Sequence, residues 1–78
     1  MHTDPPPAWV LARRRAIGAR LREARTAAGL SQERLAEMAG IDRKTVVRLE
    51  GGHSDARLTV WLRLARIIGV PLAELVRE

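Results

Sequence analysis

Cysteine, tyrosine and phenylalanine are absent from this sequence, and its 78 residues include only two tryptophans and two histidines. Without cysteine the chain has neither disulfides nor thiolate metal ligands, which suits a reducing cytoplasm. His2 and His53 are too few and too isolated to hold zinc, so we expect no metal and no cofactor. The sequence also lacks a histidine–carboxylate cluster and a phosphate-cradling glycine loop, which argues against an enzyme.

Long apolar runs are missing as well. No segment approaches the roughly 18–20 apolar residues that span a bilayer, and the first seven residues lack the architecture of a signal peptide. We therefore expect a cytoplasmic protein with no membrane partner. Fourteen basic residues outnumber nine acidic ones, for a net charge of +5. In a chain long enough for one small domain, that excess favours nucleic acid or another anionic surface as partner.

Helical periodicity runs through most of the chain, and no strand pattern, repeat or low-complexity tract interrupts it. Three consecutive prolines predict a disordered lead over residues 1–7, although Pro7 could also begin the first helix. A single all-α domain of five helices is then expected over residues 8–78. The first helix ends at Gly29, and its apolar positions are Val10, Ile17, Leu21, Ala24 and Ala28.

The next two helices are short and joined by a tight turn. Ser31 is the N-cap candidate for a helix over residues 32–39, Gly40 breaks it, and Ile41 plugs the turn. Asp42 is expected to cap a helix over residues 43–50, which ends at the Gly51–Gly52 pair. The residues expected to face inward from these two helices are Leu35, Ala36, Ala39, Val46 and Leu49.

Two further helices complete the domain. One covers residues 58–68, or starts earlier with Asp55 or Ser54 as its cap, and the other covers residues 72–76 after the Val70–Pro71 bend. The inward positions of the longer helix are predicted to be Leu58, Trp61 or Leu62, Leu64, Ala65 and Ile68.

The helix over residues 43–50 contains the side chains best suited to contact a partner. Val46 and Leu49 anchor its inner face, while its outer face presents Arg43, Lys44, Val47 and Arg48. Arginine can bond bidentately to guanine O6 and N7, and valine can contact a thymine methyl group, so the face is suited to reading base edges. The alternative is that these are ordinary solvated helix residues, but the preceding helix and turn disfavour it.

The residues resemble the Cro and phage-repressor family, the lambda repressor-like or XRE-type helix-turn-helix regulators of bacteria and phages. The resemblance extends from Ile17 to Leu75. It is carried by Leu21, Arg25, Gly29, Leu30, Ser31, Gln32, Leu35, Ala36, Ala39, Gly40, Ile41, Val46, Leu49, Glu50, Gly52, Leu58, Leu64, Ala65, Gly69, Val70 and Leu75. It implies a compact five-helix domain with a helix-turn-helix over residues 32–50. The implied function is sequence-specific binding of double-stranded DNA by a transcriptional regulator, in particular a repressor.

The resemblance also assigns roles to single residues. Gln32 matches a glutamine that touches a DNA phosphate and braces the start of the recognition helix, beside Ser31 at the same helix N-terminus. Arg43, Lys44 and Arg48 match the main base-reading positions. Arg25 and Glu50 match an ion pair that positions the recognition helix. The opposing interpretation of this pair is two separately solvated charges.

This chain departs from the family pattern in two places. Asp42 stands where the family has a small polar cap, and its carboxylate could reject some sites or accept from a cytosine amine. The family often has a proline and a serine cap after the recognition helix, whereas this chain has Ala56 and Arg57. The phosphate-contacting groups of this loop are therefore open, with His53, Ser54 and Arg57 as candidates.

Several alternatives remain open at this point. Arg13, Arg14 and Arg15 could form an electrostatic arm or the solvated start of the first helix. Trp9, Val10 and Leu11 are expected to pack against the fifth helix, with a dimer seam as the alternative, and Trp61 is expected in the core. A homodimer would use the fifth helix through Leu72, Leu75 and Val76, although a monomer that pairs only on DNA is equally compatible with the sequence. The second function considered is an antitoxin or adaptor that binds another protein.

Overall fold

The structure is a computed structural model that describes residues 4–78. Its helices are α1 (Ala8–Ala27), α2 (Gln32–Ala39), α3 (Arg43–Glu50), α4 (Leu58–Ile68) and α5 (Leu72–Val76). No strand occurs among residues 4–78, and the expected all-α, five-helix class is confirmed. Residues 4–7 are exposed and carry no helix. The rest of the expected disordered lead lies outside the described residues, and its disorder stays a prediction.

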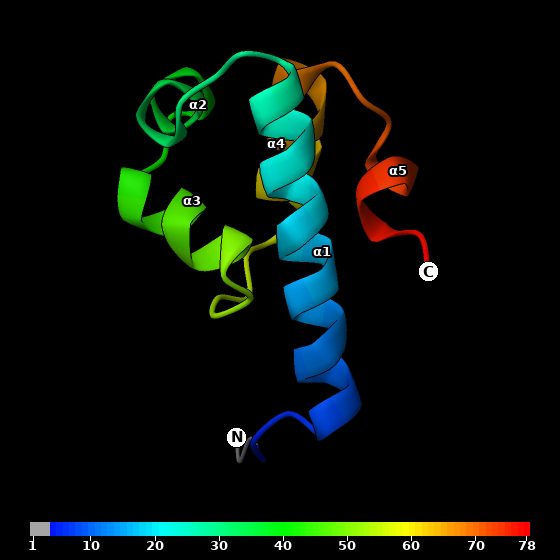
Figure 1. The fold of residues 1–78 in the computed structure, drawn as a ribbon. Coiled ribbons are helices and arrows are strands. Elements are labelled where there is room, and N and C mark those ends of the chain that lie inside the picture. Colours follow the sequence, from blue (N-terminus) through cyan, green and yellow to red (C-terminus); the bar gives the residue numbers. More distant parts are fainter. Residues whose placement is uncertain (1–3) are drawn as a thin grey trace.

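The long helix α1 runs through the middle of the fold, with α3 on one side and α5 on the other (Figure 1). α2 and α3 pack against each other, and α4 packs against both α2 and α5. The recognition helix expected from the sequence is therefore held by two neighbours, α1 and α2. This arrangement leaves its remaining side facing solvent.

The core is apolar and continuous across all five helices. Within the described part of the chain no polar or charged residue is fully buried. Burial of each large apolar side chain stabilises the fold by about 1.5–3 kcal/mol. The buried set comprises Leu21, Leu35, Ala36, Ala39, Val46, Leu49, Leu64, Ala65, Ile68 and Leu75.

Gly40 sets the direction in which the chain leaves α2. Its φ of 70° lies in the left-handed region, which L-residues with a side chain disfavour. The Ile41 backbone N–H then donates to the Ala36 carbonyl at 3.0 Å, and Ile41 packs half-buried against the core. The turn therefore fixes where α3 begins, and Ile41 plugs it as expected.

A second glycine, Gly18, lets α1 approach the end of α3 backbone to backbone. A Cβ atom at Gly18 would overlap the carbonyl oxygen of Leu49 and lie 2.7 Å from that of Glu50. Only glycine leaves room for this contact. Sequence reasoning did not single out Gly18, because a lone glycine in a helical stretch is usually tolerated rather than required.

Three apolar positions differ from their expected placement, and a fourth resolves the choice between Trp61 and Leu62. Trp9 is 70% exposed at the first turn of α1, and Leu58 is 63% exposed at the first turn of α4. Trp9 stands at the free end of α1, and Leu58 lines an open apolar pocket, so neither side chain is covered. Leu62 is exposed while Trp61 is half-buried against the core, and Ala28 is exposed because α1 ends before it.

Candidate nucleic-acid interface

The outer face of α3 is cationic and unpaired. Arg43, Lys44 and Arg48 are exposed, and Val47 between them is 41% exposed. On the opposite side Val46 and Leu49 are fully buried. Among residues 4–78, none of the three cations takes part in a hydrogen bond or ion pair. Their donors are therefore available to an outside partner, while the helix that carries them is fixed in the core.

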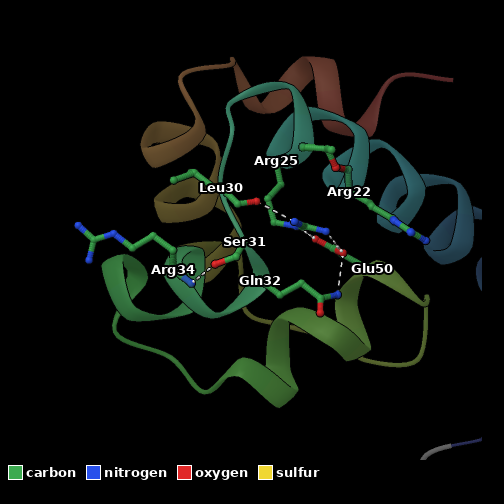
Figure 2. A network of polar contacts seen from close by, with 8 residues as sticks. Arg22, Arg25, Leu30, Ser31, Gln32, Arg34 and Glu50 are labelled. Carbon is green, nitrogen blue, oxygen red and sulfur yellow. Dashed lines mark hydrogen bonds and ion pairs between the residues drawn. The ribbon is translucent and has the colours of Figure 1, made fainter.

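A largely buried polar cluster ties the C-terminal end of α3 to α1 and α2 (Figure 2). Arg25 Nε donates to Glu50 Oε2 at 2.6 Å, and Arg25 Nη2 donates to Oε1 at 3.1 Å. The same guanidinium donates through Nη1 to the Leu30 carbonyl at 2.7 Å. The Arg25 and Glu50 side chains are only 11% and 4% exposed. This bidentate pair is the contact that the resemblance implied, and it excludes two separately solvated charges.

Gln32 joins this cluster at an unexpected end. Its Nε2 donates to Glu50 Oε1 at 3.0 Å (Figure 2), so it braces the last residue of α3 and not the first. At this end of α3 the Glu50 carboxylate supplies the acceptor that the Gln32 amide hydrogen needs. The amide nitrogen has two hydrogens, so one remains for a further acceptor.

The start of α2 has its N-cap in place. The Ser31 hydroxyl accepts from the Arg34 backbone N–H at 2.9 Å (Figure 2). The first amides of a helix have no partner within it, and Ser31 satisfies the one belonging to Arg34. The amides of Gln32 and Glu33 are left, beside the Gln32 side chain. This end of α2 can accept an anion such as a phosphate oxygen.

Asp42 occupies the N-cap position of α3, but its carboxylate does not cap the helix. The Thr45 N–H, which a capping side chain would take, donates instead to the Asp42 backbone carbonyl at 3.0 Å. The expected side-chain cap is therefore wrong. The exposed Asp42 carboxylate makes no capping bond at the N-terminal end of α3, next to Arg43.

The loop between α3 and α4 also differs from expectation. α4 begins at Leu58 with Arg57 at its N-cap position and no side-chain cap, so the earlier start capped by Asp55 or Ser54 is wrong. Asp55 is instead 3.2 Å from Arg14 in an ion pair, which removes it from the helix end. Ser54 lines an apolar pocket, while His53 and Arg57 are exposed.

The arginines before Gly18 are built into the fold. Arg13 donates to the Val76 carbonyl at 2.7 Å, and Arg14 binds Asp55, so neither is a free arm or a merely solvated start. Arg15 packs against Gly52 and is exposed. Arg22 is exposed as well (Figure 2). Arg15 and Arg22 stand three residues before and four after Gly18, so helical spacing puts them beside α3. Sequence reasoning missed Arg22, and its spacing from Gly18 was the available signal.

The expected dimer helix is only partly accessible. Leu75 is buried in the core and Leu72 is half-buried, so Leu75 cannot contact a second copy. Val76 is 40% exposed. It lines an apolar pocket of about 170 Å³ together with Leu58, Trp61 and Leu72. The apolar surface at this end of the molecule thus combines α4 with α5.

No three His, Asp or Glu side chains among residues 4–78 are grouped so that they could hold a metal ion. No helix in that range is long and apolar enough to cross a membrane.

Known proteins share this sequence and fold. A helix-turn-helix family model matches residues 21–75. The restriction-modification controller protein C.AhdI from Aeromonas hydrophila has a similar structure, with a TM-score of 0.79 and 44% identity over 82% of this chain and 97% of that chain. An HTH-type transcriptional regulatory protein of Pyrococcus furiosus is 44% identical over 57 residues, which are 73% of this chain and 18% of that protein.

A phage protein is also similar. The CTXphi transcriptional repressor RstR of Vibrio cholerae is 33% identical over 62 residues, which are 80% of this chain and 56% of that repressor. The chain thus spans less than two thirds of the Pyrococcus and Vibrio relatives. From the family match and the fold, the chain belongs to the helix-turn-helix family of the Cro and phage-repressor type, which consists of DNA-binding transcriptional regulators and not of enzymes.

Proposed function

We propose that this protein is a sequence-specific regulator that occupies a double-stranded DNA operator and represses transcription there. The observation that supports this most strongly is the outer face of α3. Arg43, Lys44 and Arg48 are exposed and unpaired among the described residues, while Val46 and Leu49 lock the helix into the core. A helix of this kind fits the major groove, and its guanidinium groups match guanine edges.

Phosphate contacts frame this base-reading helix on two sides. At the start of α2, the Gln32 amide and the free backbone amides receive one phosphate. The exposed His53 and Arg57 after α3 and the exposed α1 arginines Arg15 and Arg22 are the candidates for a second set of phosphate contacts. Arg25 and Ser31 act by positioning, since their polar groups are already used inside the domain. Several phosphate contacts make binding fall steeply as salt rises.

Repression is the simplest mode of action for such a domain. A protein that covers an operator competes with polymerase for the same DNA, and it needs no catalytic group to do so. The controller protein and the phage repressor to which the chain is similar support a regulatory role of this kind. A protein acting on chromosomal or phage DNA works in the cytoplasm, at the nucleoid.

A two-fold dimer on a palindromic operator is part of the proposal. Helix-turn-helix dimers read half-sites roughly 34–36 Å apart. The surface that would pair the two copies is the α4–α5 pocket with Leu58 and Val76 at its edge. It offers a projecting leucine and an apolar hollow on one face, which is the self-complementary arrangement that a two-fold interface needs. Leu75, being buried, supports this surface from inside.

The test of the function compares base contacts with phosphate contacts. A duplex selected from a random pool is titrated with protein, alongside an unrelated duplex. Arg43→Ala or Arg48→Ala is expected to weaken binding to the selected duplex by about 1–3 kcal/mol while leaving the unrelated duplex within a factor of a few. Gln32→Ala is expected to weaken both duplexes evenly. If all three variants bind the selected duplex as the parent does, α3 is not the docking face.

The dimer is tested separately, by sedimentation and by binding to a palindrome. Leu58→Glu introduces a charge at the edge of the pocket and is expected to abolish cooperative binding to paired half-sites while leaving a single half-site unaffected. Met38→Glu is the matched control, because Met38 is also exposed but lies in a groove between α2 and α4. Equal behaviour of the two variants would place the interface elsewhere.

A further inference from the structure

The outer face of α3 combines three cations with one carboxylate and contains no amide side chain. From this set we infer that the operator half-site is read mainly at G·C base pairs, and that Asp42 selects a cytosine. The inference rests on the proposed function, because it concerns what the same face recognises. It adds the base composition of the target and a specificity role for Asp42.

The cations favour guanine. In the major groove guanine presents two acceptors, O6 and N7, and arginine or lysine donates to both. Adenine is read bidentately by asparagine or glutamine, which supply a donor and an acceptor together. Residues 42–50 contain neither. Gln32 belongs to α2, and its Nε2 donates to Glu50 at the opposite end of α3 from Asp42, so it lies outside this face and is assigned to a phosphate instead. The face therefore lacks the group that would favour adenine.

Asp42 supplies the one acceptor, and the fold leaves that acceptor unused. Its carboxylate makes no capping bond, because the Thr45 N–H already donates to the Asp42 backbone carbonyl. The side chain is exposed and has no ion pair within residues 4–78. It stands at the N-terminal end of α3, the end at which recognition helices contact base edges. DNA phosphates repel a carboxylate at this position. A hydrogen bond donated by a base to Asp42 would offset that repulsion.

Cytosine is the base that meets this requirement. Guanine and thymine present acceptors in the major groove, which repel a carboxylate. Adenine presents its N6 donor beside its own N7 acceptor, whereas cytosine itself presents only the N4 donor in the major groove. A carboxylate therefore ranks cytosine first at the position it faces. Asp42 both accepts from the correct base and rejects the others.

The length of the face sets the length of the contacted site. An α-helix rises about 1.5 Å per residue and stacked base pairs are about 3.4 Å apart, so the span from Asp42 to Arg48 faces roughly three base pairs. Val47 is the one exposed apolar side chain of this span, and it accommodates one thymine methyl. The remaining contacts fall on guanine and cytosine, so at least two adjoining pairs of each half-site are G·C.

The experiment is a selection of bound duplexes from a random double-stranded pool, run with the parent protein and with Asp42→Asn. The parent is expected to enrich a G·C core with one invariant cytosine. Asp42→Asn is expected to change that single position from cytosine to adenine, because asparagine reads adenine N6 and N7. Asparagine is also a good N-cap residue, so the fold should persist. In competition between duplexes that differ only there, we expect a preference of about tenfold to reverse.

Glu23→Gln is the matched control. It removes the same charge from an exposed residue of α1, in a groove that Glu74 and Arg77 also line, and it is expected to leave the motif unchanged. A parent motif whose contacted core is A·T, or an Asp42→Asn motif identical to the parent's, overturns this inference and leaves the proposed function standing. If the parent enriches no motif at all, both the inference and sequence-specific reading are wrong.

Discussion

The two sides of α1 are built differently. On the α2–α3 side, polar contacts are buried and specific, with Arg25, Gln32 and Glu50 joined in one cluster. On the α4–α5 side, the polar contacts are exposed, as between Arg13 and the Val76 carbonyl, and Leu58 and Val76 line an open apolar pocket. The first side must hold α3 in one orientation to read DNA, and the second has surface left for another molecule. One side of this small domain therefore positions the recognition helix, and the other side offers surface for contact with another molecule.

The largest effect should come from breaking the buried cluster. Glu50→Ala removes the carboxylate from Arg25, whose side chain is only 11% exposed in the parent, and we expect this to cost about 3–5 kcal/mol of unfolding free energy. Glu37→Ala is the control, because Glu37 pairs with Arg34 in an exposed ion pair at 3.0 Å. Such surface pairs contribute about 0–1 kcal/mol. Chemical denaturation of both variants measures the difference, and similar losses would refute a special role for the cluster.

A smaller but still clear effect is expected from Gly18→Ala. The added methyl group would collide with the backbone carbonyls of Leu49 and Glu50, and overpacking of this kind costs about 1–3 kcal/mol. Because the collision pushes α1 away from α3, operator affinity should fall more than binding to random DNA. Gly51→Ala is the control, since its methyl group would meet mainly the movable His53 side chain. Thermal unfolding and DNA titration together distinguish the two variants, and equal melting temperatures would show that the contact is not tight.

The difference between the α2–α3 side and the α4–α5 side also explains which features the sequence could predict. On the α2–α3 side, local signals determine the structure: Ser31 caps α2, Gly40 turns the chain, and Val46 and Leu49 repeat at helical spacing. The structure has these elements where the pattern put them. The Gln32 contact with the far end of α3 was not predictable, because it depends on which acceptor the tertiary fold brings within reach.

On the α4–α5 side, prediction failed at the first turn of α4. Leu58 continues the apolar stripe of α4, yet it is 63% exposed, because at the first turn the stripe faces an open pocket and not the closed core. Periodicity identifies the face of a helix but not how far along that face a neighbour extends. The partner of Asp55 was missed for a similar reason: Arg14 is distant in sequence, and only the fold brings the two within 3.2 Å.

The smallest effect on folding is expected at Trp9, and it is informative for that reason. A side chain that is 70% exposed contributes little to the monomer, so Trp9→Ala should change the unfolding free energy by no more than about 0.5 kcal/mol. Leu64→Ala, in the core, should cost about 2–5 kcal/mol. Unfolding should be measured at low and at high protein concentration, because a contact between copies stabilises by mass action. A Trp9→Ala loss that grows with concentration would place Trp9 in the interface between copies. A large loss independent of concentration would show instead that Trp9 packs within its own chain, and the two sides of α1 would then be less different than their exposed residues indicate.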